Sequence, residues 1–165
     1  MSGPELPAGV TINKDASRGN LLFVTLRLES GEELPLVVDT GAAGTIVDKS
    51  LEPKLGKRLE TGTMWNFGVK HKSGVYATPK LYLGSRLLST SAEVFSTDLK
   101  QLSARSGIRI MGILGMDCLR YYCIQLDFEV GQMRFLAPGQ LDVAKWGKAF
   151  PILLSTEGNS DGEYA

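Results

Sequence analysis

The sequence predicts an all-β fold made of short strands with little helix. Apolar and more polar residues alternate from Leu22 to Leu28, which is the period of a half-buried strand. Turns that contain glycine recur between the apolar segments, as in "SGEE" and at Gly84 and Gly131. Many short strands separated by such turns are typical of a β-barrel or a β-sandwich.

The first half of the chain divides into two pairs of extended segments. Residues 20–39, "NLLFVTLRLESGEELPLVVD", predict a hairpin whose second strand ends at Asp39. "TIVDKSLEPKLG" follows with a short strand and then a loop or helical turn, which Pro53 interrupts. Residues 59–83 supply the second pair, with a turn within "NFGVKHKSG", and "RLLSTSAEVFST" adds a further strand.

The second half of the chain contains the segments that favour helix. "DLKQLSARSG" fits a short surface helix that begins near Asp98 and ends at Gly107. The apolar "IRIMGILG" leads into "MDCLRYY", which fits one or two helical turns. "CIQLDFEVGQMRFLAP" predicts a hairpin that turns near Gly131, and "AFPILL" predicts a last short strand.

The composition argues against several classes of protein. The 165 residues suit one domain with its own core, and 18 Lys+Arg balance 18 Asp+Glu, so we expect no nucleic-acid partner. No apolar stretch approaches the roughly 20 residues that cross a bilayer, and no secretory signal pattern is visible, so the sequence assigns no compartment. Cys118, Cys123 and a single histidine argue against a zinc site. We expect two buried free thiols, with an internal disulfide bridge as the less favoured alternative, and no metal or other cofactor.

The stretch "LPLVVDTGA" raises a question of free energy. Asp39 directly follows the apolar residues Leu36, Val37 and Val38, where a lone carboxylate is costly to desolvate. Taken alone, Asp-Thr-Gly would be explained as a turn at the end of a strand. The downstream segment "GILGMD", which begins at Gly112, favours a functional interpretation instead.

These segments, in this order, resemble the retropepsin-like aspartic proteases, the single-lobe family that includes the retroviral enzymes. The shared features are an apolar strand into Asp-Thr-Gly-Ala, a hairpin flap, and Gly-Ile-Leu-Gly before a short helix, and they extend from Leu21 to Ala137. The resemblance implies a closed acid-protease barrel, with one short helix after Gly-Ile-Leu-Gly, in a domain over residues 19–140. Residues 1–18 would form a flexible N-terminal arm. Residues 141–165 would form a C-terminal strand and tail, which begins a further segment or contributes to a dimer interface.

The implied activity is that of an aspartic endopeptidase acting on peptides or proteins. Two Asp carboxylates share one proton and activate a water molecule, and no metal or cofactor takes part. Asp39 would be the catalytic residue. Because the chain has one Asp-Thr-Gly, the resemblance implies that a homodimer supplies the second Asp39 at a two-fold axis. A second lobe in a longer protease is the other arrangement.

The neighbours of Asp39 also receive roles from the resemblance. Thr40 would bond across the two-fold axis, and the N–H of Gly41 would donate to the carboxylate. Ala42 replaces the Ser or Thr of many two-lobed relatives, so the ionised carboxylate lacks one hydrogen bond, and we expect a pH optimum nearer neutral than that of a gastric enzyme. Four further residues would pass under this loop and support it: Gly112, Ile113, Leu114 and Gly115.

The candidate flap is "TMWNFGVKHKSGVYA", the one hairpin in the required interval. Trp65, Asn66, Phe67 and Gly68 would close over the peptide, with Gly68 or Gly74 as the flexible turn. Packing of Trp65 and Phe67 on the barrel is an equally good interpretation.

The sequence leaves two further alternatives open. Asp117, in "GMDCL", is better explained as the N-cap of a short helix than as the second catalytic carboxylate. A non-proteolytic dimerisation or peptide-binding module is the alternative function, because a fold does not fix a function.

Overall fold

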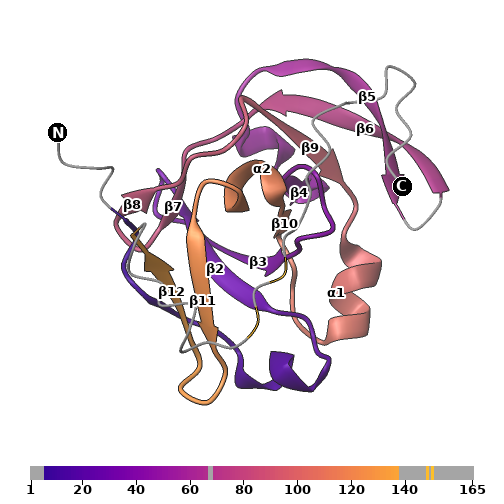
Figure 1. Cartoon of the computed structure of the whole chain (residues 1–165). Coiled ribbons are helices and arrows are strands. Elements are labelled where there is room, and N and C mark those ends of the chain that lie inside the picture. The colour runs from indigo at the N-terminus through magenta and orange to yellow at the C-terminus, as the bar shows by residue number, and fades with distance from the viewer. Residues whose placement is uncertain (1–5, 67–68, 138–147, 149, 151–165) are drawn as a thin grey trace, which may run out of the picture.

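The computed structural model describes residues 6–66, 69–137, 148 and 150, and strands predominate over helices within them (Figure 1). The strands are β1 (Val10–Thr11), β2 (Phe23–Leu28), β3 (Glu33–Val38), β4 (Ile46–Asp48), β5 (Arg58–Asn66), β6 (Val69–Ala77), β7 (Leu81–Leu83), β8 (Arg86–Leu87), β9 (Glu93–Thr97), β10 (Gly112–Leu114), β11 (Cys123–Asp127) and β12 (Gln132–Leu136). The helices are α1 (Lys100–Ser106) and α2 (Met116–Leu119), and 3₁₀ turns cover Lys14–Arg18 and Lys49–Lys54.

The strands form one large sheet and one small sheet. The large sheet has nine strands in the order β5-β6-β9-β4-β10-β3-β2-β7-β8, and the small sheet has the order β1-β12-β11. The predicted all-β class is therefore confirmed. The predicted closure into a barrel is not seen in the described residues, because the edge strands β5 and β8 do not pair with each other. With only two residues, β8 offers too short a ladder to close the sheet.

The predicted hairpins and the surface helix are present. β2 pairs with β3 in antiparallel fashion, and β11 pairs with β12 around Gly131, whose φ of 74° favours glycine. The Asp98 carboxylate accepts a hydrogen bond from the N–H of Lys100 at 2.9 Å where α1 begins. α1 ends at Gly107, which has a φ of 69°. The local sequence predicts the turns of both hairpins and the two ends of α1.

The predicted N-terminal arm is in part built into the fold. β1 pairs with β12, and Ile12 is buried in the main core. The Asn13 side chain accepts a hydrogen bond from the N–H of Phe23 and donates one to the carbonyl of Leu21, both at 2.8 Å. Residues 10–13 are therefore not a loose arm. The C-terminal segment 141–165 lies outside the described residues except for Lys148 and Phe150.

The core covers both faces of β3. Leu34 and Leu36 belong to the main cluster of buried side chains. Val37 points to the opposite face, as alternation along a strand requires, and packs with Leu99 and Ile110 in a second cluster. Because both faces are packed, the end of β3 is a firmly held point from which Asp39 leaves the sheet.

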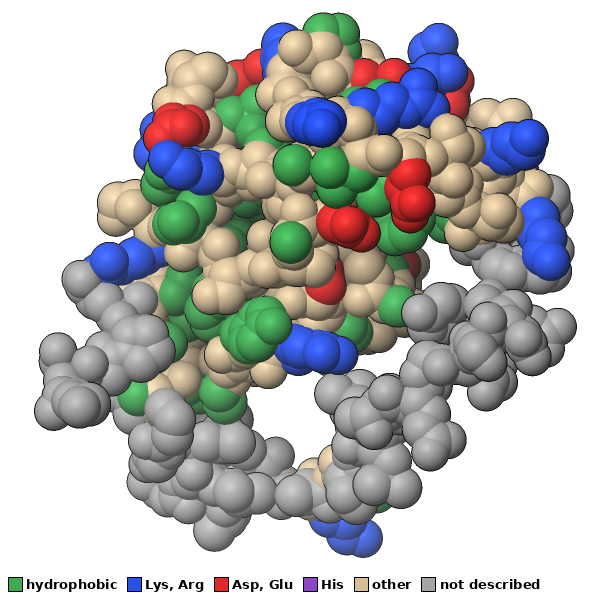
Figure 2. Space-filling model, turned by 90° about the horizontal axis from the view of Figure 1, so that it is seen from above, with side chains coloured by type: hydrophobic (Ala, Val, Ile, Leu, Met, Phe, Trp, Pro, Cys, Tyr) green, Lys and Arg blue, Asp and Glu red, His purple; other side chains and the backbone are tan. Residues whose placement is uncertain are grey.

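The surface carries mixed charge. Figure 2 shows Lys and Arg side chains interspersed with Asp and Glu over the face seen from above, with apolar side chains between them. In the part of the chain that the structure describes, neither helix is long and apolar enough to cross a membrane.

Candidate active site

Asp39 lies immediately after β3, at the centre of an unusual arrangement of strands. β10 runs parallel to β3, with Leu114 opposite Val38, and antiparallel to β4, with Ile113 opposite Ile46. The strands that enter and leave the loop 39–45 are thus separated by a third strand from far along the chain (Figure 1). The N–H of Asp39 donates to the carbonyl of Leu114 at 3.1 Å, which joins the loop directly to β10.

The two glycines that flank Ile113 and Leu114 permit this close passage. A Cβ on Gly112 would lie 2.6 Å from the carbonyl oxygen of Ile46, and a Cβ on Gly115 would lie 2.5 Å from that of Gly44. Neither glycine has a positive φ. The requirement for glycine is therefore steric and comes from the neighbouring backbone.

The Asp39 carboxylate is half-buried and only partly engaged. Its Oδ1 accepts a hydrogen bond from the N–H of Gly41 at 2.8 Å, and the carbonyl of Asp39 accepts one from the N–H of Ala42 at 3.3 Å. Among the described residues, Oδ2 accepts no hydrogen bond. Thr40 and Gly41 are exposed. In this part of the chain one oxygen is therefore oriented, and the other has no hydrogen-bond partner.

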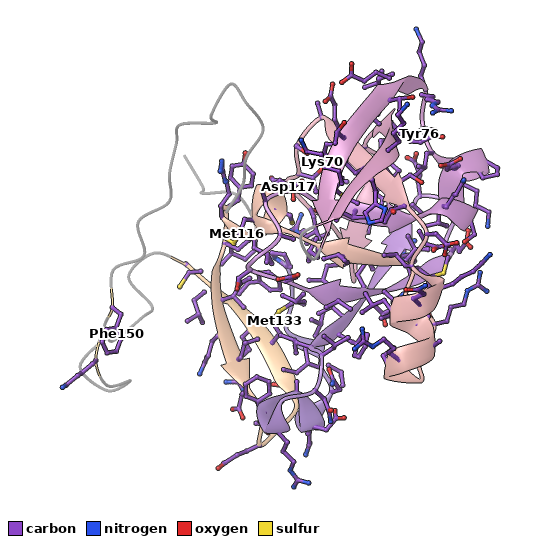
Figure 3. The ribbon with its side chains drawn as sticks, turned by 90° about the vertical axis from the view of Figure 1, so that its right-hand side faces the viewer. Lys70, Tyr76, Met116, Asp117, Met133 and Phe150 are labelled. Carbon is purple, nitrogen blue, oxygen red and sulfur yellow. The ribbon has the colours of Figure 1, made fainter. Side chains whose placement is uncertain are left out.

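The loop is also attached to the start of α2. The N–H of Met116 donates to the carbonyl of Ala42 at 2.8 Å, and the N–H of Asp117 donates to that of Ala43 at 3.1 Å. Figure 3 shows Met116 and Asp117 beside each other at this end of α2. The first amides of a helix lack partners inside the helix, so the loop that contains Asp39 supplies them here.

The sequence predicts that Asp117 caps α2, but its side chain does not do so. Gly115 precedes the helix, and no side chain caps it. The Asp117 carboxylate instead accepts a hydrogen bond from the hydroxyl of Thr45 at 2.7 Å and lies 2.9 Å from the hydroxyl of Ser91. Sequence reasoning missed Thr45 and Ser91, because only the pairing of distant strands brings them to Asp117.

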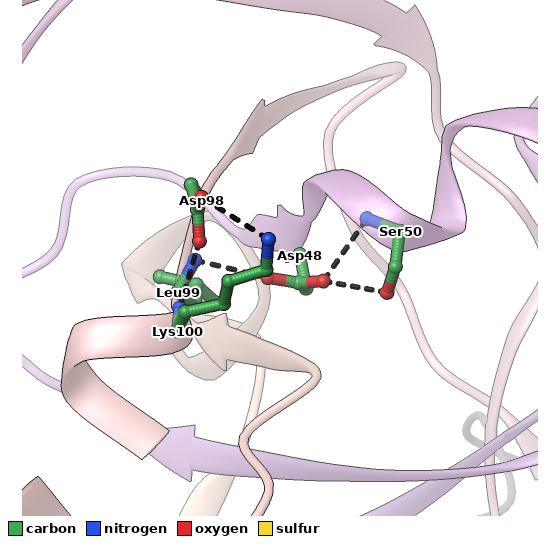
Figure 4. Close-up of polar contacts among 5 residues, drawn as sticks. All are labelled: Asp48, Ser50, Asp98, Leu99 and Lys100. Atoms are coloured by element: carbon green, nitrogen blue, oxygen red, sulfur yellow. Dashed lines mark hydrogen bonds and ion pairs between the residues drawn. The ribbon is translucent and has the colours of Figure 1, made fainter. Parts of the chain in front are cut away.

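Asp48 is a second carboxylate that the fold holds firmly (Figure 4). It is 9% exposed and accepts hydrogen bonds from the N–H and hydroxyl of Ser50 and from the N–H of Leu99. Burial alone raises the pKa of Asp48. The hydrogen bonds from Ser50 and Leu99, together with the charge of Arg109, outweigh it and lower the pKa below its ordinary value. Its role is to join β4 to the segment before α1.

The candidate flap corresponds to the hairpin of β5 and β6, the longest in the large sheet. Trp65 and Asn66 belong to β5, and Asn66 pairs with Val69. Phe67 and Gly68 lie outside the described residues. Gly74 is not a turn residue, because it lies within β6 between Thr61 of β5 and Ser96 of β9.

In the part of one chain that the structure describes, Asp39 is the carboxylate at the end of β3, and Asp117 and Asp48 are engaged by other partners. Within the described ranges, no group of three His, Cys, Asp or Glu side chains is arranged to hold a metal ion. Two surface hollows, of about 380 and 620 Å³, lie elsewhere: the first beside Phe23 and Arg105, the second beside Leu28 and Pro79. Neither adjoins Asp39.

No protein-family model matches this chain, and no curated protein matches its sequence. The geometry around Asp39 is therefore the basis on which a function is assigned.

Proposed function

We propose that this chain is an aspartic endopeptidase of the retropepsin-like type, and that it acts as a homodimer in which each subunit contributes Asp39 to one dyad. The observation that carries the proposal is the state of the Asp39 carboxylate. Asp39 directly follows a strand that is buried on both faces. One oxygen of its carboxylate is held by the N–H of Gly41, and the other has no partner among the described residues. A group that exchanges protons with a substrate needs both a fixed orientation and access.

The chemistry follows from two such carboxylates that share one proton. The ionised Asp39 takes a proton from a water molecule, whose oxygen forms a bond to the peptide carbonyl carbon. The protonated Asp39 of the other subunit gives its proton to the carbonyl oxygen. When the tetrahedral intermediate collapses, the C–N bond breaks and the Asp39 that took the proton from water gives it to the amine nitrogen. The other Asp39 takes a proton back from one hydroxyl of the intermediate, which leaves the new carboxyl group and restores the dyad.

The need for a partner comes from the count of carboxylates at the site. The carboxylate of Asp117 is engaged by Thr45 and Ser91, and Asp48 is engaged by Ser50 and Leu99. Neither is available to complete a dyad. A two-fold axis beside the exposed Thr40 and Gly41 would bring together two copies of the same loop and so provide two equivalent Asp39 residues.

The substrate would be an extended peptide. Peptides commonly bind as an added strand, through main-chain hydrogen bonds. The hairpin of β5 and β6 extends away from the body of the large sheet (Figure 1). Within that sheet, β5 is an edge strand. We propose that this hairpin closes over the bound peptide.

The test is digestion of a peptide library across pH 3 to 8, run beside Asp39→Asn. The carboxamide keeps the shape of the side chain but cannot act as the base, so cleavage by the native chain alone is expected. Absence of cleavage by a folded dimer would contradict the proposal and favour a non-proteolytic dimerisation or peptide-binding module. Absence of cleavage by a folded monomer would contradict the homodimer and favour one lobe of a longer protease.

A further inference from the structure

We propose that Asp117 is a positioning residue for the Asp39 loop, and that it acts through its hydrogen bonds and not through its charge. This inference rests on the proposed peptidase function. It concerns a carboxylate that the chemistry above does not use. Asp117 is half-buried in the first turn of α2 and connects three segments that are distant in the sequence: the loop 39–45, α2 and the segment before β9.

The first connection passes through Thr45. This side chain is 1% exposed, and its Oγ1 accepts a hydrogen bond from the N–H of Gly115 at 3.3 Å. Its hydroxyl proton is therefore directed to Oδ1 of Asp117, at 2.7 Å. A buried hydroxyl that both accepts and donates in this way fixes the end of the loop against the start of α2.

The second connection passes through Ser91. Its Oγ lies 2.9 Å from Oδ2 of Asp117 and 2.6 Å from the carbonyl oxygen of Glu93. A hydroxyl has a single proton, so it donates to only one of these two acceptors at a time. The N–H of Ser91 also approaches Oδ2, at the long distance of 3.4 Å.

This geometry predicts that an amide can replace the carboxylate. In Asp117→Asn, the side-chain oxygen would still accept from Thr45. The NH₂ group would donate to Oγ of Ser91, whose proton would then be given to the carbonyl of Glu93. The variant would lose only the long contact from the N–H of Ser91. Asp117→Ala would instead leave the hydroxyl of Thr45 unpaired at a buried position, which is costly.

The consequence for catalysis comes from the backbone bonds at the same place. The amides of Met116 and Asp117 hold the carbonyls of Ala42 and Ala43, and these residues follow Asp39 in the loop. If α2 shifts, the carboxylate shifts with it. A displacement of about 1 Å away from the reacting atoms lowers a rate by about 100-fold.

The experiment compares Asp117→Asn, Asp117→Ala, Thr45→Val and Thr45→Ser by steady-state peptide cleavage. We expect Asp117→Asn and Thr45→Ser to keep kcat within about threefold of the native chain. We expect Asp117→Ala and Thr45→Val to lose about 100-fold in kcat, with little change in KM. Asp98→Ala is the matched control, because Asp98 accepts a hydrogen bond at the start of α1 without touching the loop, and it should behave as the native chain.

Hydrogen exchange at the amides of Met116 and Asp117 gives a readout independent of cleavage. In Thr45→Val we expect faster exchange at both amides. In Asp117→Ala we expect faster exchange at the amide of Met116. In Asp117→Asn and Thr45→Ser we expect no change. If the native chain cleaves no peptide but this exchange pattern appears, the peptidase function fails and the positioning of the loop stands. If Asp117→Asn is as inactive as Asp117→Ala while its amides stay protected, the charge of Asp117 takes part in the reaction and the inference is overturned. Native exchange and activity in Asp117→Ala would also overturn it.

Discussion

At the scale of single residues, the loop that holds Asp39 depends on the absence of side-chain atoms at particular glycines. A Cβ on Gly115 would lie 2.5 Å from the carbonyl oxygen of Gly44, whereas a Cβ on Gly44 would meet nothing within 4 Å. Two glycines in contact with each other therefore have opposite tolerance to substitution. Only one of them is required by the passage of β10 between β3 and β4.

We expect Gly115→Ala to reduce the free energy of unfolding by about 1–3 kcal/mol, because the backbone has to shift to accept the methyl group. Urea denaturation of the two variants measures this difference. Gly44→Ala is the matched control and should stay within about 0.5 kcal/mol of the native chain. Equal losses in the two variants would show that the close approach of Gly115 to Gly44 does not limit the fold.

Asp48 should contribute a pH-dependent part of the stability. Because its pKa in the folded chain is lowered from 3.8, its contribution is fully present above the pKa of the unfolded chain. It is lost as the pH falls through the lower, folded value. We expect Asp48→Asn to be less stable than the native chain at pH 7, and the difference to shrink below about pH 4. Urea denaturation at several pH values measures it, with Asp98→Asn as an exposed control. A difference that does not change with pH would contradict this role.

At the scale of elements, α2 is too short to be stable by itself and is held by what surrounds it. Its amides bond to the Asp39 loop, and Cys118 and Leu119 are buried in the core. Burial, followed by the charge of the neighbouring Asp117, raises the pKa of the Cys118 thiol to about 12. Both cysteines are free in the described part of the chain, as the sequence predicts. The predicted burial is confirmed for Cys118 and wrong for Cys123, which is half-buried.

The state of α2 can be followed through these two thiols. Alkylation requires the thiolate, so we expect iodoacetamide at pH 8 to label Cys123 well before Cys118 in the folded chain. Peptide mass spectrometry after timed alkylation gives the two rates, and denatured protein provides the control in which both react. Equal rates in the folded chain would mean that α2 is not packed as described.

Local sequence predicts those elements that local interactions form. The hairpins of β2 with β3 and of β11 with β12 follow from alternation and from glycine in the turns. The two-residue strand β1 has no such signal, and it exists only because β12 pairs with it. Asp117 was misassigned for the same reason: capping is a local rule, whereas its partners Thr45 and Ser91 arrive through tertiary structure.

At the scale of the whole molecule, the order of strands was beyond the reach of the sequence. Alternation predicts strands and the face that each buries, but it does not say that β10 lies between β3 and β4 or that the nine-stranded sheet stays open at β5 and β8. The same limit applies to the site. Asp39 and the two glycines at 112 and 115 could be singled out by motif, whereas the proposed dyad would be completed only in an assembly, which the pattern of a single chain does not describe.

The central claim is that two copies of Asp39 form one dyad, and mixing subunits tests it most directly. Native chain and Asp39→Asn are mixed in equal amounts, allowed to exchange subunits, and assayed for peptide cleavage at constant total concentration. If each dimer needs both carboxylates, only dimers of two native subunits cleave, and activity falls to about a quarter of the unmixed native value. A fall to about one half would show that each subunit works alone and would contradict a shared dyad. If the native chain itself cleaves no peptide, the proposed peptidase function is contradicted.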